Sequence, residues 1–345
     1  MTTFWTFFAV VVYLALIVYL GYKGYKATRG TTDYLLAGRE THPYIMAMSY
    51  GATFISTSAI VGFGGAAGVF GMGLLWLTVL NIFFGIFIAF VCFGGRTRQL
   101  GRKLDAHTFP ELLGRRYQSR FIQVAAALLI FAAMPLYASA VLIGAAKYLA
   151  QQFHLSYEVA LLIFSVLVTV YVIMGGLKGV MYSDALQGTI MLFGMSILLI
   201  LSYHKLGGIL QAHQKLTDMA FLVPENLRQG GHRGWTTMPA FGSPIWWTLI
   251  STIVMGVGIG VLAQPQLAIR YMTVKSRREL NRAVAVGGVF ILMMTGVAFV
   301  VGALTNIYFY ENSGKIAIAA AGGDVEAILP MFIKGSMPGW FAVLF

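Results

Sequence analysis

The chain is 345 residues long, 58% hydrophobic and only 10% charged, whereas a soluble protein is usually about 25% charged. This composition excludes an ordinary soluble domain and indicates a polytopic helical membrane protein. The net charge of +12 at pH 7 does not indicate a nucleic-acid partner, because no soluble domain remains to carry such a site. Cys92 is the only cysteine, which excludes a disulfide within the chain and a thiolate metal site.

Hydropathy predicts eight spans, each near the roughly 20 apolar residues that a bilayer requires, at 4–22, 45–70, 72–95, 121–150, 155–175, 177–203, 243–269 and 283–309. The N-terminus has no basic region and no small-residue cleavage site, so we interpret the first span as retained rather than as a signal peptide. A last apolar run from Pro338 to Phe345 is too short to cross. We therefore expect a longer protein that continues past Phe345.

Basic residues are distributed unevenly between the two sides of the membrane. Seventeen of the 24 lysines and arginines fall in alternate connections, at 22–44, 96–120, 176–178 and 270–282. The positive-inside rule puts these connections in the cytoplasm and the N-terminus outside. In this interpretation Arg270 belongs to a cytoplasmic loop, and no arginine lies deep in the membrane.

The two longest connections each have a helical signal. On the inner side, Thr108 and Pro110-Glu111 are typical of a helix start, where proline is accepted and glutamate favours the positive end of the dipole. On the outer side, residues 204–242 mix apolar and polar residues. We expect a short interfacial helix there.

The segment 47–68 is apolar enough for a bilayer, yet it carries a cluster of hydroxyl side chains and glycines. Loosened backbone is tolerated in hydrocarbon only where it lines a cavity or packs against protein. The pattern predicts a broken helix with an ion or small solute at the break. Freed carbonyls, together with hydroxyls such as Thr53 and Ser56, would suit a hard monovalent cation.

Asp184 lies about two turns inside the predicted span 177–203. A carboxylate at that depth is costly, and three functional readings fit it: an ion site, a proton relay or the partner of a buried cation. The structural alternative is a helix cap or a side chain that reaches the interface. We favour a functional role because Ser183 and Gln187 flank it. Sodium and a proton both stay open as the coupling ion.

The segment 248–272 has alternating glycines at Gly256, Gly258 and Gly260, followed by Gln264-Pro265. Proline inside a helix removes a backbone hydrogen bond and kinks the chain. The structural alternative is a glycine-packed helix crossing with a proline kink. Glycine-interrupted segments at corresponding positions of two halves indicate the binding site of an inverted-repeat transporter, and this segment corresponds to 47–68.

An enzyme is not expected, because the spans contain no pairing of a nucleophile with a base. The six histidines show no zinc-site spacing.

Five segments resemble the sodium/solute symporter family, which includes carriers of proline, pantothenate, monocarboxylates and sugars. The resemblance runs from about residue 4 to the end of the chain and is most specific at 175–188. The matching segments are DYLLAGR at 33–39, ATFISTSAIVGFGGAAG at 52–68, HTFPELLGRRY at 107–117, GGLKGVMYSDALQG at 175–188 and QPQLAIRYM at 264–272.

The resemblance implies an all-α polytopic fold with the LeuT-type inverted-repeat core of ten helices. Within one transmembrane domain, 1–345, the extra N-terminal helix would be 4–22, the first repeat of five helices 45–203, and part of the second repeat 243–345. The core would be incomplete at the C-terminus, because the eighth core helix with its Ser/Thr motif would come after Phe345. We therefore expect that these residues alone do not transport.

The resemblance also implies site residues. Sodium would be bound by backbone carbonyls that correspond to Ala52 and Ile55, and the family aspartate linked to sodium binding corresponds to Asp184. The arginine that ends the first cytoplasmic motif corresponds to Arg39. Sodium would be the coupling ion, with no other metal or cofactor. The residues expected to bind the substrate are Thr53, Ser56, Thr57, Gly256, Gly260 and Gln264.

The substrate follows from departures from the proline carriers. They have aspartate where this chain has Phe54, and tryptophan and tyrosine where it has Val257 and Val261. The sequence is most similar to the pantothenate branch, so we expect a sodium symporter for a small organic acid, pantothenate-like or a monocarboxylate, in the plasma (inner) membrane. The alternatives are a symporter for an amino acid or a sugar, and a transporter-like sensor domain of a signalling protein.

Overall fold

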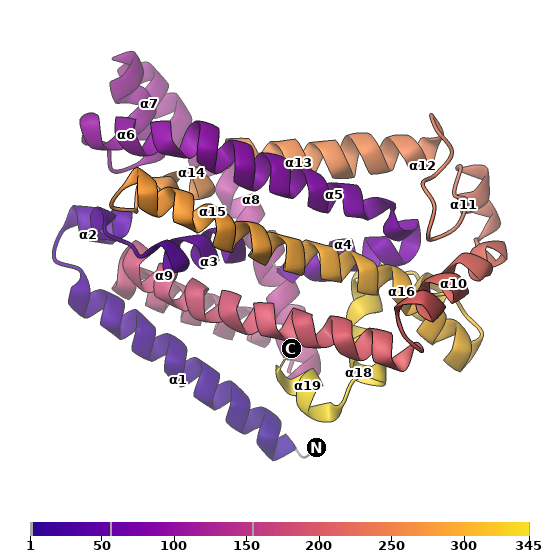
Figure 1. Cartoon of the computed structure of the whole chain (residues 1–345). Helices are drawn as coiled ribbons and strands as arrows, with labels where there is room; N and C mark the ends of the chain where they lie inside the picture. Colours follow the sequence, from indigo (N-terminus) through magenta and orange to yellow (C-terminus); the bar gives the residue numbers. More distant parts are fainter. Residues whose placement is uncertain (1–2, 56, 154, 345) are drawn as a thin grey trace.

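The computed structural model describes residues 3–55, 57–153 and 155–344, and the named elements in these ranges are all helices (Figure 1). Six helices among the described residues are long and apolar enough to cross a membrane. This confirms the prediction of an all-α polytopic membrane protein. One of the six, Tyr157–Lys205, combines two predicted spans, and another, Ala59–Lys103, combines the second part of the span 45–70 with the span 72–95; the chain reverses inside both.

The first combined helix, Ala59–Lys103, is 45 residues long, more than twice the roughly 20 residues of one span. The chain turns at Gly71, whose φ of +79° is readily adopted only by glycine. The Tyr50 hydroxyl then donates to the carbonyl of Gly85 at 2.7 Å, so the returning arm lies beside the preceding span. The returning arm consists of η2 (Gly71–Leu74), α5 (Leu75–Leu80), the π-helical η3 (Asn81–Gly94) and α6 (Gly95–Lys103).

The second combined helix is α9 (Tyr157–Lys205), which is 49 residues long and breaks at Gly176 with φ 54° and ψ −160°. Both of its arms return to α1 (Thr3–Ala27). A methyl group at Gly21 would lie 3.4 Å from Tyr171 Cβ, and one at Gly179 would lie 3.6 Å from Gly21 Cα. The predicted boundary at residues 176–178 is therefore confirmed as a chain reversal.

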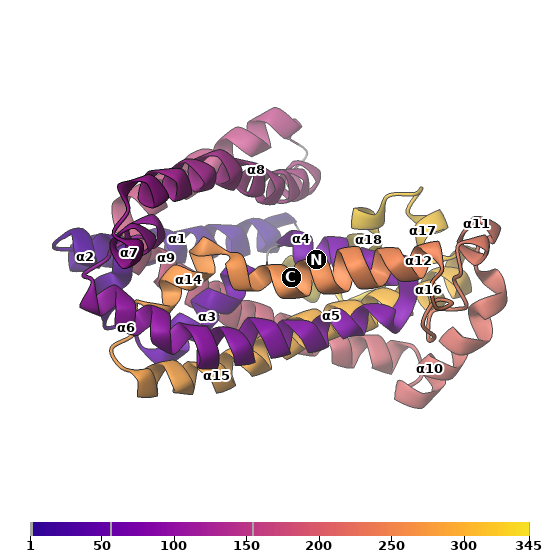
Figure 2. The ribbon, with the colours of Figure 1, turned by 90° about the horizontal axis from the view of Figure 1, so that it is seen from above.

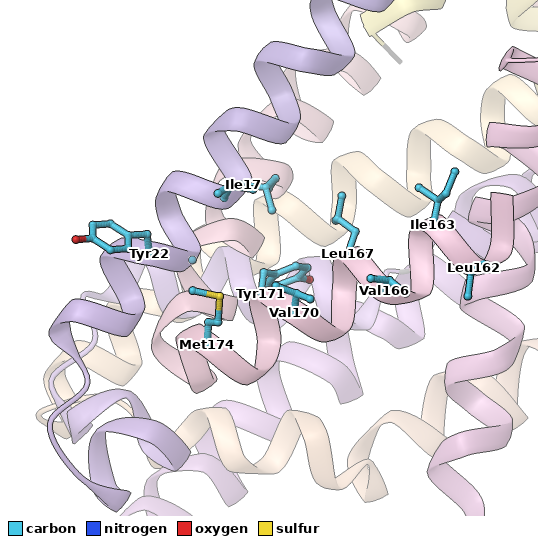
Figure 3. Close-up of a pocket in the computed structure, with 11 residues that line it drawn as sticks. Ile17, Tyr22, Leu162, Ile163, Val166, Leu167, Val170, Tyr171 and Met174 are labelled. Atoms are coloured by element: carbon cyan, nitrogen blue, oxygen red, sulfur yellow. The ribbon is translucent and has the colours of Figure 1, made fainter. Parts of the chain in front are cut away.

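The first arm of α9 and the middle of α1 enclose a hollow of about 660 Å³ (Figure 3). Its lining consists of aliphatic side chains, Met174, Gly21 and the tyrosines Tyr22 and Tyr171. An opening lined in this way is suited to the hydrocarbon of a bilayer. None of the predicted site residues is among its described lining residues.

The core is built from two pairs of helices that run side by side. The first pair packs the broken helix of α3 (Pro43–Phe54) and α4 (Thr57–Phe70) alongside a second continuous stretch. That stretch consists of α15 (Arg277–Ile291), η7 (Leu292–Gly296) and α16 (Val297–Ser313). A methyl group at Gly302 would lie 2.0 Å from the Gly64 carbonyl oxygen, so the two backbones touch.

In the second pair, the returning arm after Gly71 follows the segment 244–271. Gly73 lies against Leu249 near one end, and Gly94 lies against Tyr271 near the other. The segment 244–271 contains α12 (Pro244–Trp247), η5 (Thr248–Met255), α13 (Gly256–Gly260), η6 (Val261–Ala263) and α14 (Pro265–Tyr271).

The helix α8 (Arg120–Phe153) lies to one side of these pairs (Figure 2). It contacts α7 (Phe109–Tyr117), α9 and α4. Its large apolar side chains are mostly exposed, for example Phe131 at 79%, as expected for a helix that faces lipid.

One end of the molecule carries α2 (Thr31–Leu36), η1 (Ala37–Arg39), α6, α7 (Phe109–Tyr117) and the start of α15, and we call it the basic end (Figure 1). The predicted helix start is confirmed there, because Thr108 Oγ1 accepts from the Glu111 amide at 3.2 Å. Arg39 is buried and donates to the Ala106 carbonyl at 3.0 Å. Its role is therefore to join two connections of the basic end.

The opposite end is formed by short helices. The expected interfacial helix is present in the connection 204–242 as α10 (Ile209–Asp218), which η4 (Met219–Leu222) and α11 (Glu225–Gln229) follow. The segment after α16 forms α17 (Ala317–Ala320), η8 (Val325–Ala327), α18 (Ile328–Ser336) and α19 (Gly339–Leu344), which the sequence did not predict. Leu329 and Phe332 of α18 are fully buried, so this segment is part of the core.

The carbonyl end of α4 is satisfied from outside the helix. Trp235 Nε1 and Asn306 Nδ2 each donate to the Gly68 carbonyl at 2.8 Å. His232 Nδ1 accepts from the Gly234 amide at 3.1 Å, which leaves Nε2 as the protonated nitrogen that donates to the Val69 carbonyl at 2.9 Å. The carbonyls that lack intrahelical partners at a helix end are thus capped by a neutral histidine and a tryptophan.

A matched pair of glycine substitutions should separate packing from flexibility. A methyl group at Gly65 would lie 1.9 Å from the Val325 carbonyl oxygen, whereas one at Gly62 meets no atom of the described residues within 4 Å. Gly65→Ala should cost about 1–3 kcal/mol through overpacking, and Gly62→Ala should stabilise α4 by about 0.5–1 kcal/mol. Apparent unfolding temperatures in detergent measure both, and equal shifts of the same sign would contradict this packing.

Acidification should weaken the cap on α4. Burial lowers the pKa of His232, although its bond to the Val69 carbonyl opposes the shift. The stabilisation from the neutral ring is therefore complete above the ordinary pKa of about 6.5 and is lost as the pH falls through the lowered pKa. Unfolding temperatures measured from neutral to acid pH should fall more steeply for the unchanged chain than for His232→Gln, and parallel curves would refute this.

Candidate functional site

The first predicted broken helix is present, and its break lies between α3 and α4. The residue that ends α3, Ile55, has the non-helical angles φ −101° and ψ 88°, and its amide still donates to the Gly51 carbonyl at 2.8 Å. Because α3 ends at Phe54, the carbonyls of its last turn have no intrahelical partner further on. Ala52 is in that turn. The structure therefore places at the break both residues whose carbonyls are predicted to bind sodium, Ala52 and Ile55.

The glycines around this break have a different role from the one the pattern predicted. The break falls at Ile55 and not at a glycine. Gly51 makes room for the ring of Phe290, because a methyl group there would lie 2.3 Å from Phe290 Cδ1. Gly64 lies against Gly302. These glycines permit close helix contacts on either side of the break and do not form it.

The second predicted break is also present, at Gln264. This residue is extended, with φ −74° and ψ 115°, and Pro265 starts α14 directly after it. Proline is suited to the first helical position because its missing N–H would have no partner there. The two breaks approach each other at Gly85, where a methyl group would lie 3.4 Å from Val261 Cγ1 and 4.0 Å from Phe54 Cζ.

Asp184 lies beside the first half of the first broken helix. Its Oδ2 accepts hydrogen bonds from Ser49 Oγ at 2.6 Å and from Thr53 Oγ1 at 3.5 Å. Arg270 Nη2 lies 3.1 Å from the same oxygen, and Arg270 Nε donates to Ser49 Oγ at 2.9 Å. Arg270 Nη2 also donates to Thr53 Oγ1. We call these four residues the polar cluster.

The polar cluster corrects the placement of Arg270 in a cytoplasmic loop and the expectation that no arginine lies at this depth. The side chains of Arg270 and Asp184 are only 5% and 13% exposed. Of the three functional readings of Asp184, the structure shows the partner of a buried cation. A signal for Arg270 was present in the sequence: it follows Pro265 by one and a half turns of a restarted helix, and a buried carboxylate needs a cation.

The polar cluster joins three separate elements. Ser49 and Thr53 come from α3, Asp184 from the second arm of α9, and Arg270 from α14. Each hydroxyl accepts from Arg270 and donates to Asp184, so the charges are connected directly and through two relays. Because α3 and α14 both run from their breaks to the basic end, the cluster closes the molecule on that side of the breaks.

An aromatic cluster of Tyr50, Phe90 and Tyr271 reinforces the closure. The ring centroids of Tyr50 and Phe90 are 4.7 Å apart, and those of Phe90 and Tyr271 are 5.1 Å apart. The Tyr271 hydroxyl donates to that of Tyr50 at 3.2 Å. All three rings are buried, and they pack α3, η3 and α14 together between the breaks and the basic end.

The predicted substrate residues fall into three groups. Thr53 belongs to the polar cluster. Gly256 and Gly260 lie on an exposed face of α13, and Gln264 at the second break accepts from Gln266 Nε2 at 3.0 Å. Ser56 lies outside the described residues, as does the side chain of Thr57. The described residues therefore bring Thr53 and Asp184 together, while the glycines and Gln264 lie along the second broken helix.

Comparison with known proteins identifies the family. The sequence profile of the sodium:solute symporter family matches residues 34–345. The chain is 30% identical over 279 residues to a sodium/pantothenate symporter of Haemophilus influenzae, covering 79% of this chain and 54% of that protein. It is 27% identical over 308 residues to sodium/proline symporter 2 of Staphylococcus saprophyticus, covering 86% and 57%. The chain thus spans just over half the length of these relatives.

The fold is similar to that of a solved structure. The chain matches the substrate-bound outward-open state of a Na⁺-coupled sialic acid symporter with a TM-score of 0.77 at 20% identity, covering 98% of this chain and 67% of that one. The expected LeuT-type architecture is consistent with this match. The same arrangement of helices is thus reached with little shared sequence.

Removing either member of the buried pair should be costly. Asp184→Asn or Arg270→Gln leaves one buried charge without its partner and should destabilise the fold by about 3–5 kcal/mol. The double variant should cost less than the sum, with a coupling of about 1–3 kcal/mol. The coupling energy is obtained from the apparent free energy of unfolding in detergent, measured for the unchanged chain, the two single variants and the double variant.

The matched control is the surface pair of Arg282 and Glu279, which are 3.0 Å apart with 56% and 24% exposed side chains. Its coupling should stay within about 0.5 kcal/mol. Similar coupling for the two pairs would show that the buried pair does not hold the three elements together.

Proposed function

The chain belongs to the sodium:solute symporter family, and from that premise we propose that it forms part of a sodium-coupled carrier that imports a small organic acid by alternating access. The observation that carries this proposal is the polar cluster, which joins both broken helices to α9 on one side of the breaks. A carrier of this kind needs a closure that can form on one side of its site and be released.

We propose that Arg270 and Asp184 form the closure of the inner pathway. In the topology that the positive-inside rule predicts, the basic end faces the cytoplasm and the N-terminus lies outside. The polar and aromatic clusters both lie between the breaks and this end. Their closed arrangement corresponds to a carrier that is shut toward the cytoplasm, and opening inward would require α14 to carry Arg270 away from Asp184.

The coupling ion is sodium in this proposal. Two features support it: the break offers carbonyls at Ala52 and Ile55, and Asp184 contacts Thr53, which lies between these two residues in the chain. A hard cation prefers such oxygen ligands. Asp184 would then alternate between contact with Arg270 and contact with the ion site. Ion binding and closure of the inner pathway would therefore influence each other.

The proposed substrate is pantothenate-like or a monocarboxylate, bound between the breaks. Phe54 and Val261 both approach Gly85 there, and they replace polar or aromatic residues of the proline carriers. A methyl group at Gly260 would meet no atom within 4 Å, so α13 offers open space beside the break. The proline carrier among the relatives supports an amino acid as the second candidate.

Uptake by the full-length protein that contains this chain tests the proposal. Uptake of labelled pantothenate should require sodium, and Asp184→Asn and Arg270→Gln should each lower it at least about tenfold, equivalent to about 1.4 kcal/mol. Asp218→Asn is the matched control, since Asp218 is an exposed acid on α10 bonded only to Gln214 among the described side chains.

Three outcomes are informative. Uptake that persists without sodium and in both variants would refute the carrier mechanism. Unlabelled proline could suppress the sodium-dependent uptake while monocarboxylates leave it unchanged. That result would favour the second candidate substrate, an amino acid. Loss of uptake in Asp218→Asn as well would show that the assay reports on folding rather than on the polar cluster.

A further inference from the structure

The basic end contains a groove of about 670 Å³ at the junction of η3 and α6. Three arginines line it, namely Arg96 and Arg98 of α6 and Arg277 at the start of α15. Apolar side chains from the end of η3, including Val91 and Phe93, form the other part of the lining. We call it the arginine groove.

The arginine groove has a positive charge that the protein does not neutralise. No carboxylate is among its lining residues in the described part of the chain. Other arginines of the basic end are paired, such as Arg39 with Asp105 and Arg115 with Glu111. Neither Arg96 nor Arg277 has an ion pair among the described residues.

Arg98 is held in place by the protein backbone. Its Nε donates to the Val274 carbonyl at 3.0 Å, and its Nη2 donates to the Lys275 carbonyl. These contacts fix the floor of the arginine groove between α6 and the connection to α15. Arg96 and Arg277 line the same groove and are exposed. Such a set of donors around a fixed guanidinium suits a phosphate group, which arginine binds with its planar fork.

An apolar stripe leads from the arginine groove along the membrane-spanning helix. It consists of Val79, Phe83, Phe87 and Val91, with 51%, 49%, 52% and 40% exposure. Residues four apart share a helix face, and the rings of Phe83 and Phe87 stack at 6.0 Å between centroids. At the rise of an α-helix, the twelve residue steps from Val79 to Val91 span roughly 18 Å, somewhat more than half of the roughly 30 Å hydrocarbon core.

We propose that the arginine groove and this stripe bind one anionic phospholipid, with the phosphate at the arginines and an acyl chain along the stripe. The phosphate site and the apolar stripe are continuous on one helix, and the stripe has the length of one leaflet. Basic pockets at the cytoplasmic side of spans suit anionic headgroups. A soluble phosphate would use the arginines but leave the stripe without a role. This inference requires only that the chain is embedded in a bilayer, and it is independent of what the protein carries.

The chain provides its own probe for this site. Cys92 is its only cysteine, it is exposed, and it lines the arginine groove. A lipid bound there would cover the thiol. The rate of Cys92 alkylation by a neutral maleimide should therefore fall when phosphatidylglycerol replaces phosphatidylcholine in nanodiscs that contain the chain.

The ratio of alkylation rates in the two lipids is the readout, because direct effects of a substitution on thiol reactivity cancel in it. For the unchanged chain the ratio should show strong protection by phosphatidylglycerol. The double variant Arg96→Gln with Arg277→Gln should weaken the lipid binding that underlies this protection. The expected loss is roughly fivefold for each arginine, because a basic residue near an anionic surface contributes about 1 kcal/mol. Arg116→Gln/Arg120→Gln is the matched control, since it removes the same charge from the basic end outside the groove.

Protection that is lost only in the groove variant supports the site. Equal rates in the two lipids for the unchanged chain would overturn the proposal without relying on any variant. Equal loss in the control variant would also overturn it, since a diffuse surface potential would then explain the protection. Protection in phosphatidylcholine by added glycerol phosphate alone would show that the arginines bind a soluble phosphate and would overturn the lipid assignment.

Discussion

The buried ion pair of Asp184 and Arg270 is the constraint on which the rest of the site depends. Two charges this deep in an apolar protein are tolerated only with good geometry and additional hydrogen bonds, and Ser49 and Thr53 supply these bonds. The arginine reaches the carboxylate because α14 starts afresh at Pro265. The break in one helix thus places the cation that the carboxylate of another helix requires.

The sequence predicted the two breaks for partly correct reasons. Proline at Pro265 is a strong local signal, and the extended Gln264 before it follows from the steric restriction that proline imposes. The first break was predicted from glycines and hydroxyls, but Gly51 and Gly64 provide room for neighbouring helices instead. A glycine required for packing and one required for a bend look alike in a sequence, because only the neighbour distinguishes them.

Arg270 shows what hydropathy does not predict. A charged residue at the edge of an apolar run is ordinarily assigned to a loop. Arg270 is at such an edge, and the connection that follows it is rich in other arginines. Its burial depends on a partner 86 positions earlier in the chain. The helices after Ser313 were missed for a related reason: they are short, and the contact of α17, η8 and α18 with α4 is a tertiary effect. The family resemblance supplied the repeat architecture, which local patterns alone do not contain.

The direct backbone contact between Gly64 of α4 and Gly302 of α16 has a mechanical consequence. With no side chains between them, these helices can neither slide nor rotate past each other without losing contact or colliding. On the other side of the break, α3 meets α14 through side chains, which can change partners while the backbones separate. The two halves of the broken helix are therefore held differently: α4 lies backbone to backbone against α16, whereas α3 is joined to α14 through the side chains of Ser49, Thr53 and Arg270.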